Sequence, residues 1–569
     1  MIDSIRNISR FGRRLRPESA RSRHREEQFE LETLAERPAI SLVMPTYNTE
    51  FRYLREAIES VLAQHYPEWE LCIADDGSTD QRVRRTIESY SDPRIRSVFL
   101  ELNSGISAAS NRALELCTGE FVGFLDHDDK LTPDALLRVA QALNADPDLD
   151  VVYTDQDKLT TDGRRADPFL KPDWSPVYAL GAMYIGHLLV VRRSVAEAAG
   201  GFDSAFDKIQ DFEFMLRVSE RTSRIHHIPR ILYHWRAIPG SIAAGADQKS
   251  GVPELQARAV STHLERLDVN ATAVPHPAIP HRVMLVPGDG MSRGKVSIVV
   301  PRRGEGIDRL LDSLFGLTAY QDFEVILVEG LWSPSEPISD RHPVETVRDP
   351  APTFAPARVN NLGRERAGGE HLLFLREFVE IVEPDWIDQL LLHAGLPDVG
   401  AVGPLLVRSD GNVDQAGAAI ALRDPTGPIM PGFPADGDGY YGSLPCAREV
   451  SAVSGACMLV GRTAFEELDG FNEFYSAQYE DFDLCQRLQA RGWSVVYAPR
   501  PRVVSHQTPA ARRTATDIID RALFVDNWYD ELRGGDPFFN PGFDRGQATY
   551  DPVGAGKQRP EIAPLPGSR

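Results

Sequence analysis

The chain lacks three features that would place it in large classes of proteins. No apolar run approaches the ~20 residues that cross a bilayer, so no membrane-spanning helix is predicted. The five cysteines form no Cys-x-x-Cys pair and are odd in number, which favours reduced, structural thiols. The 62 basic residues are outnumbered by 83 acidic ones, and the net charge of -21 argues against nucleic-acid binding. With no signal-peptide pattern at its start, the chain is expected to be cytoplasmic.

One segment departs from the acidic composition. Residues 1–25 carry eight arginines against only Asp3 and Glu18. Apolar residues recur among them at three- and four-residue spacing, as on one face of a helix: Ile2, Ile5, Ile8, Phe11 and Leu15. Such a basic amphipathic helix can lie on an anionic membrane, here the inner face of the plasma membrane. The alternative is a solvated tail without regular structure.

The order of expected strands and helices predicts an α/β protein with two similar domains. Apolar strands alternate with amphipathic helices from residue 38, as in βαβ units with a mostly parallel, Rossmann-like sheet. Periodicity is then lost over a Pro- and Gly-containing stretch before the same pattern resumes. We predict a basic N-terminal segment (1–37), a first domain (38–268), a linker (269–294), a second domain (295–510), and a C-terminal helix with an irregular tail (511–569).

The second domain repeats landmarks of the first in the same order. Val296-Ser-Ile-Val-Val-Pro301 echoes Ile40-Ser-Leu-Val-Met-Pro45, and Phe323-Glu-Val-Ile-Leu-Val328 echoes Trp69-Glu-Leu-Cys-Ile-Ala74. Asn361 precedes Gly369-Glu370 at the spacing with which Asn111 precedes Gly119-Glu120. Several ordered matches indicate a duplicated domain.

The two copies differ in their acidic residues. The first copy reads Phe-Leu-Asp126-His-Asp128-Asp129 where the second reads Phe-Leu-Arg376-Glu-Phe378-Val379. Asp76 of the first copy is likewise matched by Gly330. We therefore predict that the second copy kept the fold and lost a site that the first retains.

Three carboxylates within four positions end the apolar run Phe121 to Leu125. A buried strand would deliver them to the carboxyl edge of a parallel sheet, where open α/β folds bind ligands. Their mutual repulsion is relieved by a divalent cation with oxygen ligands, itself bound to phosphate. The alternative is a solvated acidic turn.

Ordered motifs of the first copy resemble family 2 glycosyltransferases of the GT-A fold, in particular those of O-antigen and related surface-polysaccharide assembly. The resemblance covers about residues 38–268 and is weaker in the second copy, where it rests on Ser454-Gly-Ala456, Gly470-Phe471 and Tyr479-Glu-Asp-Phe-Asp483. It is carried by Val43-Met-Pro-Thr-Tyr-Asn48, Ala74-Asp-Asp-Gly-Ser78, Gly105-Ile-Ser-Ala-Ala-Ser-Asn111, Thr118-Gly-Glu120, Phe124-Leu-Asp-His-Asp-Asp129, Lys171-Pro-Asp-Trp-Ser-Pro176, Tyr184-Ile-Gly-His187 and Leu232-Tyr-His-Trp-Arg236.

The resemblance implies a role for each matching residue. Asp76 would contact the base of the donor, Asp126 its ribose or the metal, and Asp128 would be the main ligand of Mn²⁺ or Mg²⁺. Asp211 would be the general base that deprotonates the acceptor hydroxyl. The full set expected to bind the nucleotide-sugar is Pro45, Tyr47, Asn48, Asp76, Gly105, Asn111 and Asp126.

Other candidates have structural alternatives of similar weight. His234 is a further metal ligand or a histidine satisfied in the core. Trp174, His187 and Trp235 would contact the acceptor, although tryptophans in such contexts usually pack and a histidine after Gly186 is more often structural.

The expected activity is inverting, metal-dependent transfer of a hexosyl or rhamnosyl group. The donor would be a nucleoside-diphosphate-sugar, and the acceptor a growing glycan or a polyprenyl-linked glycan. Two alternatives are a bifunctional transferase with two working sites and a non-catalytic glycan-binding scaffold. A sugar-nucleotide-forming nucleotidyltransferase is disfavoured because Pro45-Thr-Tyr-Asn48 is not a Gly-rich basic loop.

Overall fold

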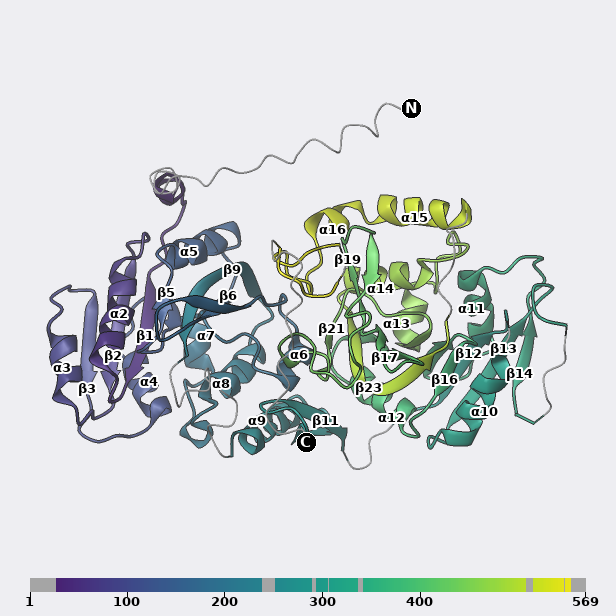
Figure 1. Ribbon diagram of the computed structural model, residues 1–569, viewed down its shortest axis with the longest axis horizontal. Helices are drawn as coiled ribbons and strands as arrows, with labels where there is room; N and C mark the ends of the chain where they lie inside the picture. Colours follow the sequence, from purple (N-terminus) through teal and green to yellow (C-terminus); the bar gives the residue numbers. More distant parts are fainter. Residues whose placement is uncertain are drawn as a thin grey trace.

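The computed structural model shows two lobes side by side along the longest axis of the molecule (Figure 1). It describes residues 27–237, 251–288, 293–304, 306–335, 341–507, 515–546 and 548–553. The expected basic helix at residues 1–25 and the extreme C-terminus lie outside these ranges. No helix in the described ranges combines the length and the apolarity that crossing a membrane requires.

The first lobe is built on one mixed sheet whose strand order is β3-β2-β1-β4-β8-β6-β9-β5, with β7 paired to β6. Neighbours are parallel among β3, β2, β1 and β4 and between β6 and β9, whereas β8 and β5 run antiparallel to theirs. The strands are β1 (Ile40–Thr46), β2 (Trp69–Asp75), β3 (Ile95–Phe99), β4 (Phe121–Phe124), β5 (Lys130–Leu131), β6 (Val151–Leu159), β7 (Arg165–Phe169), β8 (Leu189–Arg192) and β9 (Ile225–Arg236).

Helices cover both faces of this sheet because its strands are apolar on both sides. Ile40, Leu42 and Met44 of β1 pack with helices α2, α3 and α5, whereas Val43 packs with α4, α6, α7 and α8. The helices are α2 (Phe51–Leu62), α3 (Gln81–Glu88), α4 (Ile106–Leu114), α5 (Ala135–Ala145), α6 (Pro176–Gly181), α7 (Arg193–Ala198), α8 (Gln210–Ser219) and α9 (Val252–Arg266).

The second lobe repeats this topology strand for strand. Its order β14-β13-β12-β15-β22-β17-β23-β16 matches that of the first sheet, β18 pairs with β17 as β7 does with β6, and β21 is added at β23. The elements are β12 (Val296–Pro301), α10 (Ile307–Leu317), β13 (Phe323–Glu329), β14 (Glu345–Arg348), α11 (Pro356–Arg364), β15 (His371–Leu375), β16 (Val379–Ile381), α12 (Trp386–Ala394), β17 (Val399–Arg408), β18 (Val413–Gln415), β19 (Ala418–Ile420), β20 (Thr426–Pro428), β21 (Arg448–Glu449), β22 (Cys457–Gly461), α13 (Arg462–Glu467), α14 (Glu480–Ala490) and β23 (Ser494–Ser505).

Side-chain contacts confirm the duplication. Asn111 of α4 bonds the backbone N–H and carbonyl of Phe202 at 2.8 Å each. Asn361 of α11 bonds the same two groups of Phe471 at 2.9 Å each. The register of the central strands is also equal, with Ile40 opposite Phe121 in the first domain and Val296 opposite His371 in the second.

The predicted linker contains regular structure. An antiparallel hairpin of β10 (Ala271–Pro275) and β11 (Val283–Pro287) lies within it and contacts α9, α6 and α12. Each strand is only five residues long and ends in proline, which is why its alternation was weak in the sequence. One apolar cluster runs from α8 and α9 through this hairpin into α10 and α12, so the two domains share part of their core.

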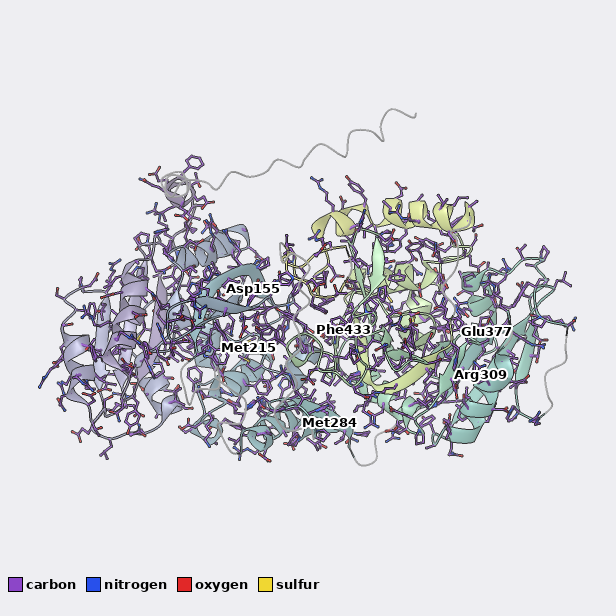
Figure 2. The ribbon with its side chains drawn as sticks, viewed as in Figure 1. Asp155, Met215, Met284, Arg309, Glu377 and Phe433 are labelled. Carbon is purple, nitrogen blue, oxygen red and sulfur yellow. The ribbon has the colours of Figure 1, made fainter. Side chains whose placement is uncertain are left out.

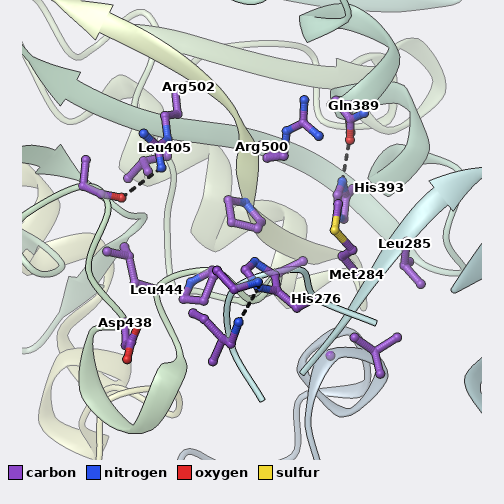
Figure 3. A pocket seen from close by; sticks show the side chains of 18 of the residues that line it. His276, Met284, Leu285, Gln389, His393, Leu405, Asp438, Leu444, Arg500 and Arg502 are labelled. Carbon is purple, nitrogen blue, oxygen red and sulfur yellow. Dashed lines mark hydrogen bonds between the residues drawn. The ribbon is translucent and has the colours of Figure 1, made fainter. Parts of the chain in front are cut away.

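A cavity of about 550 Å³ remains at this junction. It is lined by Met284 of β11, His276 directly after β10, His393 of α12, and Arg500 and Arg502 of β23 (Figure 3). After β23 the chain forms α15 (Ala515–Asn527) and α16 (Tyr529–Gly534), drawn in yellow along one side of the second lobe (Figure 1). The segment that follows α16 returns to the space between the lobes.

Candidate functional site

The acidic residues lie where the antiparallel pairing of β4 and β8 brings two chain segments together. β4 ends at Phe124, and Asp126 to Asp129 follow it. Because β8 runs antiparallel to β4, the residues before its start lie beside the residues after the end of β4. His187, two residues before β8, is thereby placed next to Asp126, with 3.7 Å between Nε2 and Oδ2.

Three side chains form a cluster that can hold a metal ion. Ligand atoms of Asp126, Asp129 and His187 all lie within 4.8 Å of one another. Of the predicted metal set, Asp126 lies in this cluster with Asp129 and His187, Asp128 follows in the same loop, and His234 pairs with Asp157. The sequence predicts His187 only as an acceptor contact, and it places Asp129 among the three carboxylates near a cation without naming it as a ligand.

Tyr233 of β9 contacts this cluster through both its hydroxyl and its ring. Its hydroxyl donates to Asp129 Oδ2 at 2.6 Å and accepts the N–H of Asp126 at 3.2 Å. Its ring stacks on the imidazole of His187 with 4.8 Å between ring centroids. A single buried side chain therefore contacts all three members of the cluster and fixes their relative positions.

Arg236 secures the other side of the acidic loop. Its N–H donates to Asp129 Oδ1 at 2.7 Å, and its guanidinium donates to the carbonyl of Asp128 at 2.5 Å and to Glu56 of α2 at 2.7 Å. Both carboxylate oxygens of Asp129 thus accept hydrogen bonds, and its side chain is fully buried. These hydrogen bonds within the protein fix the position of the acidic loop.

The electrostatics of the loop favour a cation. Burial raises the pKa of Asp128, and nearby Asp126 adds to the shift while His127 opposes it. Burial also raises the pKa of Asp129 well above its usual value, with Asp128 and Asp126 contributing. The loop therefore carries more negative charge than nearby positive groups balance. Its carboxylate oxygens and the imidazole nitrogen form a ligand set that fits Mn²⁺ or Mg²⁺.

Asp211 lies beside the same cluster, at the start of α8. Burial raises the pKa of its carboxyl group, His187 opposes this shift and Asp126 reinforces it. One carboxylate oxygen accepts the N–H of Phe212 at 2.9 Å. A carboxylate whose pKa is raised toward neutrality beside a metal-type cluster is suited to accept a proton.

The residues expected to bind the nucleotide lie at the ends of β1 and β2 and at the start of α4. Asp76 is buried, and its two oxygens accept the N–H groups of Ser104 and Gly105 at 2.7 and 2.9 Å. Asn48 accepts the N–H groups of Thr79 and Asp80 and joins the loops after β1 and β2.

Tyr47 is 44% exposed beside these loops, and its ring is accessible to a flat ligand such as a base. Pro45 lies in β1 next to it. Gly105 has a φ of 94°, and a Cβ there would meet Asp207 at 2.3 Å. The side-chain amide of Asn111 bonds Phe202, as described above. Contacts of the nucleotide-sugar with these residues stay predictions: Pro45, Tyr47, Asn48, Asp76, Gly105 and Asn111.

The remaining candidates lie at different places around the cluster. His234 Nδ1 is 2.5 Å from Asp157 Oδ1, on a part of β9 that pairs with β5. Trp235 lies at 6.2 Å from the His187 ring, and Trp174 stacks on Tyr184 at 6.4 Å in the core of the domain. Trp235 is therefore beside the cluster, whereas Trp174 packs mainly within the protein.

The second domain has none of these ligands at the equivalent positions. The shared register places Arg376 and Val379 where the first domain has Asp126 and Asp129. Extending the register of β15 with β22, by comparison with β4 and β8, places Ala456 at the position of His187. The pairing of β16 with β23 similarly places Val503 at the position of Tyr233.

A cavity of about 400 Å³ remains at this position of the second domain. Arg376 donates to Glu480 at 2.6 Å, and Asp481 accepts the N–H of Gly455 at 2.8 Å. Burial raises the pKa of Glu480 to about 7, Asp481 adds to the shift and Arg376 opposes it. Glu377, next to Arg376, lies in the second lobe, whereas Asp155 lies in the first (Figure 2).

Two parts of the chain match family models. Residues 41–200 match glycosyl transferase family 2, and residues 443–520 match glycosyltransferase like family 2. The first match contains the acidic loop and His187, and the second contains Glu480 and Asp481.

Curated relatives match most of the chain. An uncharacterized protein, y4gI, of Sinorhizobium fredii is 37% identical over 527 residues, covering 89% of this chain and 57% of its own length. The O-antigen biosynthesis protein RfbC of Myxococcus xanthus is 37% identical over 533 residues, covering 89% of this chain and 40% of its own. The chain therefore spans about half the length of these relatives.

Solved structures resemble the chain only weakly. TarS 1–349 of S. aureus in complex with UDP-GlcNAc has a TM-score of 0.33 and 24% identity, over 40% of this chain and 66% of that one. The mannosyltransferase PcManGT of Pyrobaculum calidifontis, in complex with GDP-Man and Mn²⁺, has a TM-score of 0.31 and 21% identity, over 43% and 71%. Likeness at this level supports no inference about ligands.

Proposed function

We propose that the first domain is an inverting, metal-dependent glycosyltransferase of surface-polysaccharide synthesis, because residues 41–200 and 443–520 match family 2 glycosyltransferase models. The donor is a nucleoside-diphosphate-sugar. The acceptor is a growing glycan or a polyprenyl-linked glycan. The transferred group is of the hexosyl or rhamnosyl type. The similarity to an O-antigen biosynthesis protein supports the choice of pathway class.

The observation that carries this proposal is the convergence of four side chains in the first domain. Asp126, Asp129 and His187 form one cluster, and Asp211 interacts electrostatically with two of its members. They come from the end of β4, the approach to β8 and the start of α8, so only the folded domain brings them together. A solvated acidic turn would not be buried, nor would it be fixed by Tyr233 and Arg236.

Asp126, Asp129 and His187 would hold the cation, with Asp128 as a further carboxylate in the same loop. When bound, Mn²⁺ or Mg²⁺ supplies positive charge that stabilises the departing nucleoside diphosphate. The loops after β1 and β2, tied together by Asn48, would hold the base, with Tyr47 against its face and Asp76 at its edge.

Asp211 would take the proton of the acceptor hydroxyl as that oxygen attacks the anomeric carbon. The bond to the diphosphate breaks on the opposite face, so the anomeric configuration inverts and no covalent intermediate with the protein is needed. The buried setting of Asp211 suits this role, because its raised pKa strengthens it as a base. Trp235, beside His187, is placed to contact the acceptor.

The second domain would be catalytically silent and act as a platform for the acceptor or for assembly. Arg376 places a fixed positive charge at the position of Asp126, and Val379 and Ala456 offer no ligand atom at the positions of Asp129 and His187. Placing a divalent cation beside a guanidinium in this partly buried site is unfavourable by several kcal/mol. Glu480 and Asp481 remain, so the acceptor half of the original site persists.

A donor screen tests the proposed activity. The full chain is incubated with Mn²⁺ and a panel of nucleoside-diphosphate-sugars, and release of nucleoside diphosphate is measured with and without a chelator. Metal-dependent release from one or a few donors is expected, and it should be lost in the Asp211→Asn variant. Absence of release and of donor binding across the panel would instead favour a glycan-binding scaffold.

The number of working sites is tested by calorimetry. Titration of the full chain with Mn²⁺ and the nucleoside diphosphate identified in the screen should give one site per chain. The Asp128→Ala variant, altered only in the first domain, should give none. Two sites in the wild type, with one left in the variant, would show a bifunctional transferase.

A cytoplasmic protein in peripheral contact with the membrane would fit a polyprenyl-linked acceptor. The basic segment 1–25 is the candidate for that contact. Flotation of the full chain with anionic vesicles, compared with neutral ones, measures it directly. Equal recovery with both vesicle types would contradict membrane attraction through these arginines.

A further inference from the structure

One segment of the first domain is held along its length by the second domain. This bridging segment, residues 167–177, connects β7 with the start of α6. The hydroxyl of Tyr440 accepts the N–H of Leu170 at 2.9 Å, and that of Tyr441 donates to the carbonyl of Asp167 at 2.9 Å. At its other end, the carboxylate of Glu449 accepts the N–H of Val177 at 3.0 Å.

The C-terminal segment, residues 536–546, contacts the middle of the bridging segment. Asn540, only 3% exposed, donates from Nδ2 to the carbonyl of Lys171 at 2.8 Å and to Asp155 at 3.1 Å. The carbonyl of Pro537 accepts the N–H of Asp173 at 2.8 Å. The chain thus returns from the far end of the second domain to touch β6 and the bridging segment of the first (Figure 1).

Lys171 links this contact to the candidate active site. Its side chain is fully buried, and Nζ donates to the carbonyls of Thr154 at 2.6 Å and His187 at 2.7 Å. Nζ also donates to Gln156 Oε1 at 3.0 Å, and the same oxygen accepts the N–H of His187 at 2.9 Å. The carbonyl of His187 is therefore bound by the ammonium directly, and its N–H is bound by the Gln156 oxygen that accepts from the same ammonium.

Such an ammonium needs its oxygen partners in place, because a buried charge without partners is strongly destabilising. Asp155 adds the balancing carboxylate, and its Oδ1 accepts the N–H of Lys171 at 2.8 Å. Asn540 bonds that carboxylate and the Lys171 carbonyl at once. Movement of Asn540 would therefore shift the groups that hold the backbone of His187.

We propose that Asn540 and Lys171 are positioning residues through which the C-terminal segment sets His187 in the first domain. Asn540 fixes the backbone of Lys171, the Lys171 ammonium fixes the backbone of His187, and the imidazole is thereby held against Asp126. The first domain is then complete only with a residue 353 positions after His187 in the chain. The effect on turnover rests on the proposed function, whereas the link itself does not.

The test compares Asn540→Ala with Asn527→Ala in the full chain. Asn527 is a matched control because it lies in α15 and donates to the hydroxyl of Tyr475, within the second domain. Lys171→Met removes the ammonium itself and can prevent folding, so Asn540→Ala is the decisive variant.

Hydrogen exchange measures the link without any substrate. In Asn540→Ala, peptides that contain the amides of His187 and Leu188 should exchange at least fivefold faster than in the wild type, with Asn527→Ala unchanged. Unchanged exchange in Asn540→Ala, or equal acceleration in both variants, would overturn the link. This readout stands even if the protein transfers no sugar.

Turnover measures the consequence of the link. A misplaced group in an active site lowers rates by about 10- to 100-fold, so kcat of Asn540→Ala should fall by that factor. Its KM for the acceptor and the kcat of Asn527→Ala should stay within about twofold of the wild type. Faster exchange at His187 with unchanged kcat would refute the positioning role, and an inactive wild type with faster exchange would refute the proposed function alone.

Discussion

The duplicated fold offers a matched pair for the general base. Asp211 and Asp481 each follow the first residue of an equivalent helix, and each accepts the next backbone N–H at 2.9 Å. Burial raises the pKa of both carboxyl groups. The two residues differ mainly in what lies beside them, a metal-type cluster in the first domain and Arg376 in the second.

Asparagine at either position keeps the size of the side chain, can still accept the next backbone N–H, and removes the basicity. At position 481 it loses the second bond of the carboxylate, which accepts the N–H of Gly455. Loss of a general base lowers kcat by ~10²–10⁴-fold, which is about 2.7–5.4 kcal/mol of activation free energy. We expect that loss for Asp211→Asn and a change within twofold for Asp481→Asn. Thermal unfolding of Asp211→Asn should stay near that of the wild type, because the substitution removes a buried charge. Asp481→Asn also loses the bond from Gly455 and should unfold at a lower temperature than Asp211→Asn.

The pH profile of kcat separates a base from a binding residue. Because burial raises the pKa of Asp211, wild-type activity should fall as the pH drops through a value above that of an ordinary carboxyl group. The residual activity of Asp211→Asn should lack this acid limb while donor affinity is retained. A threefold or smaller loss of kcat, or an equal loss in Asp481→Asn, would refute the assignment of Asp211 as the base.

Three further predictions concern the acidic loop and the duplicated asparagines. Asp128→Ala should abolish metal-dependent donor cleavage in saturating Mn²⁺ while the midpoint of thermal unfolding holds or rises, because burial and Asp126 disfavour its charge; near-wild-type turnover would contradict the metal assignment. Tyr233→Phe should lower stability by about 1–3 kcal/mol, because it leaves a buried oxygen of Asp129 and the N–H of Asp126 without their partner. Tyr66→Phe, which loses a 2.8 Å bond to the carbonyl of Pro38, should lower it by about 0.5–1.5 kcal/mol in the same thermal assay. Equal shifts would speak against Tyr233 as the residue that holds the acidic loop. Asn361→Ala should destabilise the second domain by about 1–3 kcal/mol without changing turnover. Asn111→Ala should lower both the stability of the first domain and the turnover, as calorimetry and the donor assay would show.

The alternation of strands and helices in the first part of each domain could be predicted because its signals are local. The run Phe121 to Leu125 and its echo near Phe374 are apolar, short and bounded by polar residues, and they form β4 and β15. The resemblance implies Asp211 as the general base, and this residue lies at the start of α8. The loss of carboxylates in the second copy was readable from the sequence alone, and the shared register confirms that alignment.

The composition of the cluster could not be predicted, because it depends on an antiparallel pairing between distant segments. His187 follows a glycine and precedes the apolar run of β8, which signals a strand but not its neighbour. Only the pairing of β8 with β4 sets His187 beside Asp126. Tyr233 has the appearance of an ordinary core residue in the sequence, since nothing local reveals that its hydroxyl faces Asp129.

Contacts between the domains were also beyond reach of the sequence. The strands of the linker hairpin are short and end in proline, so periodicity is weak where packing on α12 supplies the stability. Asn540 lies in a stretch rich in Gly, Pro and Asp that predicts an irregular tail. Its burial against Asp155 arises from tertiary packing alone.

The ion pair between Arg376 and Glu480 bears on the evolutionary history of the second domain. Restoring an acidic residue at position 376 by one mutation would leave Glu480 and Asp481 buried beside a third carboxyl group, with no guanidinium to balance them. That change would therefore destabilise the fold even though it supplies one carboxylate ligand. Val379 and Ala456 would have to change as well before the second domain offered the ligand set of the first.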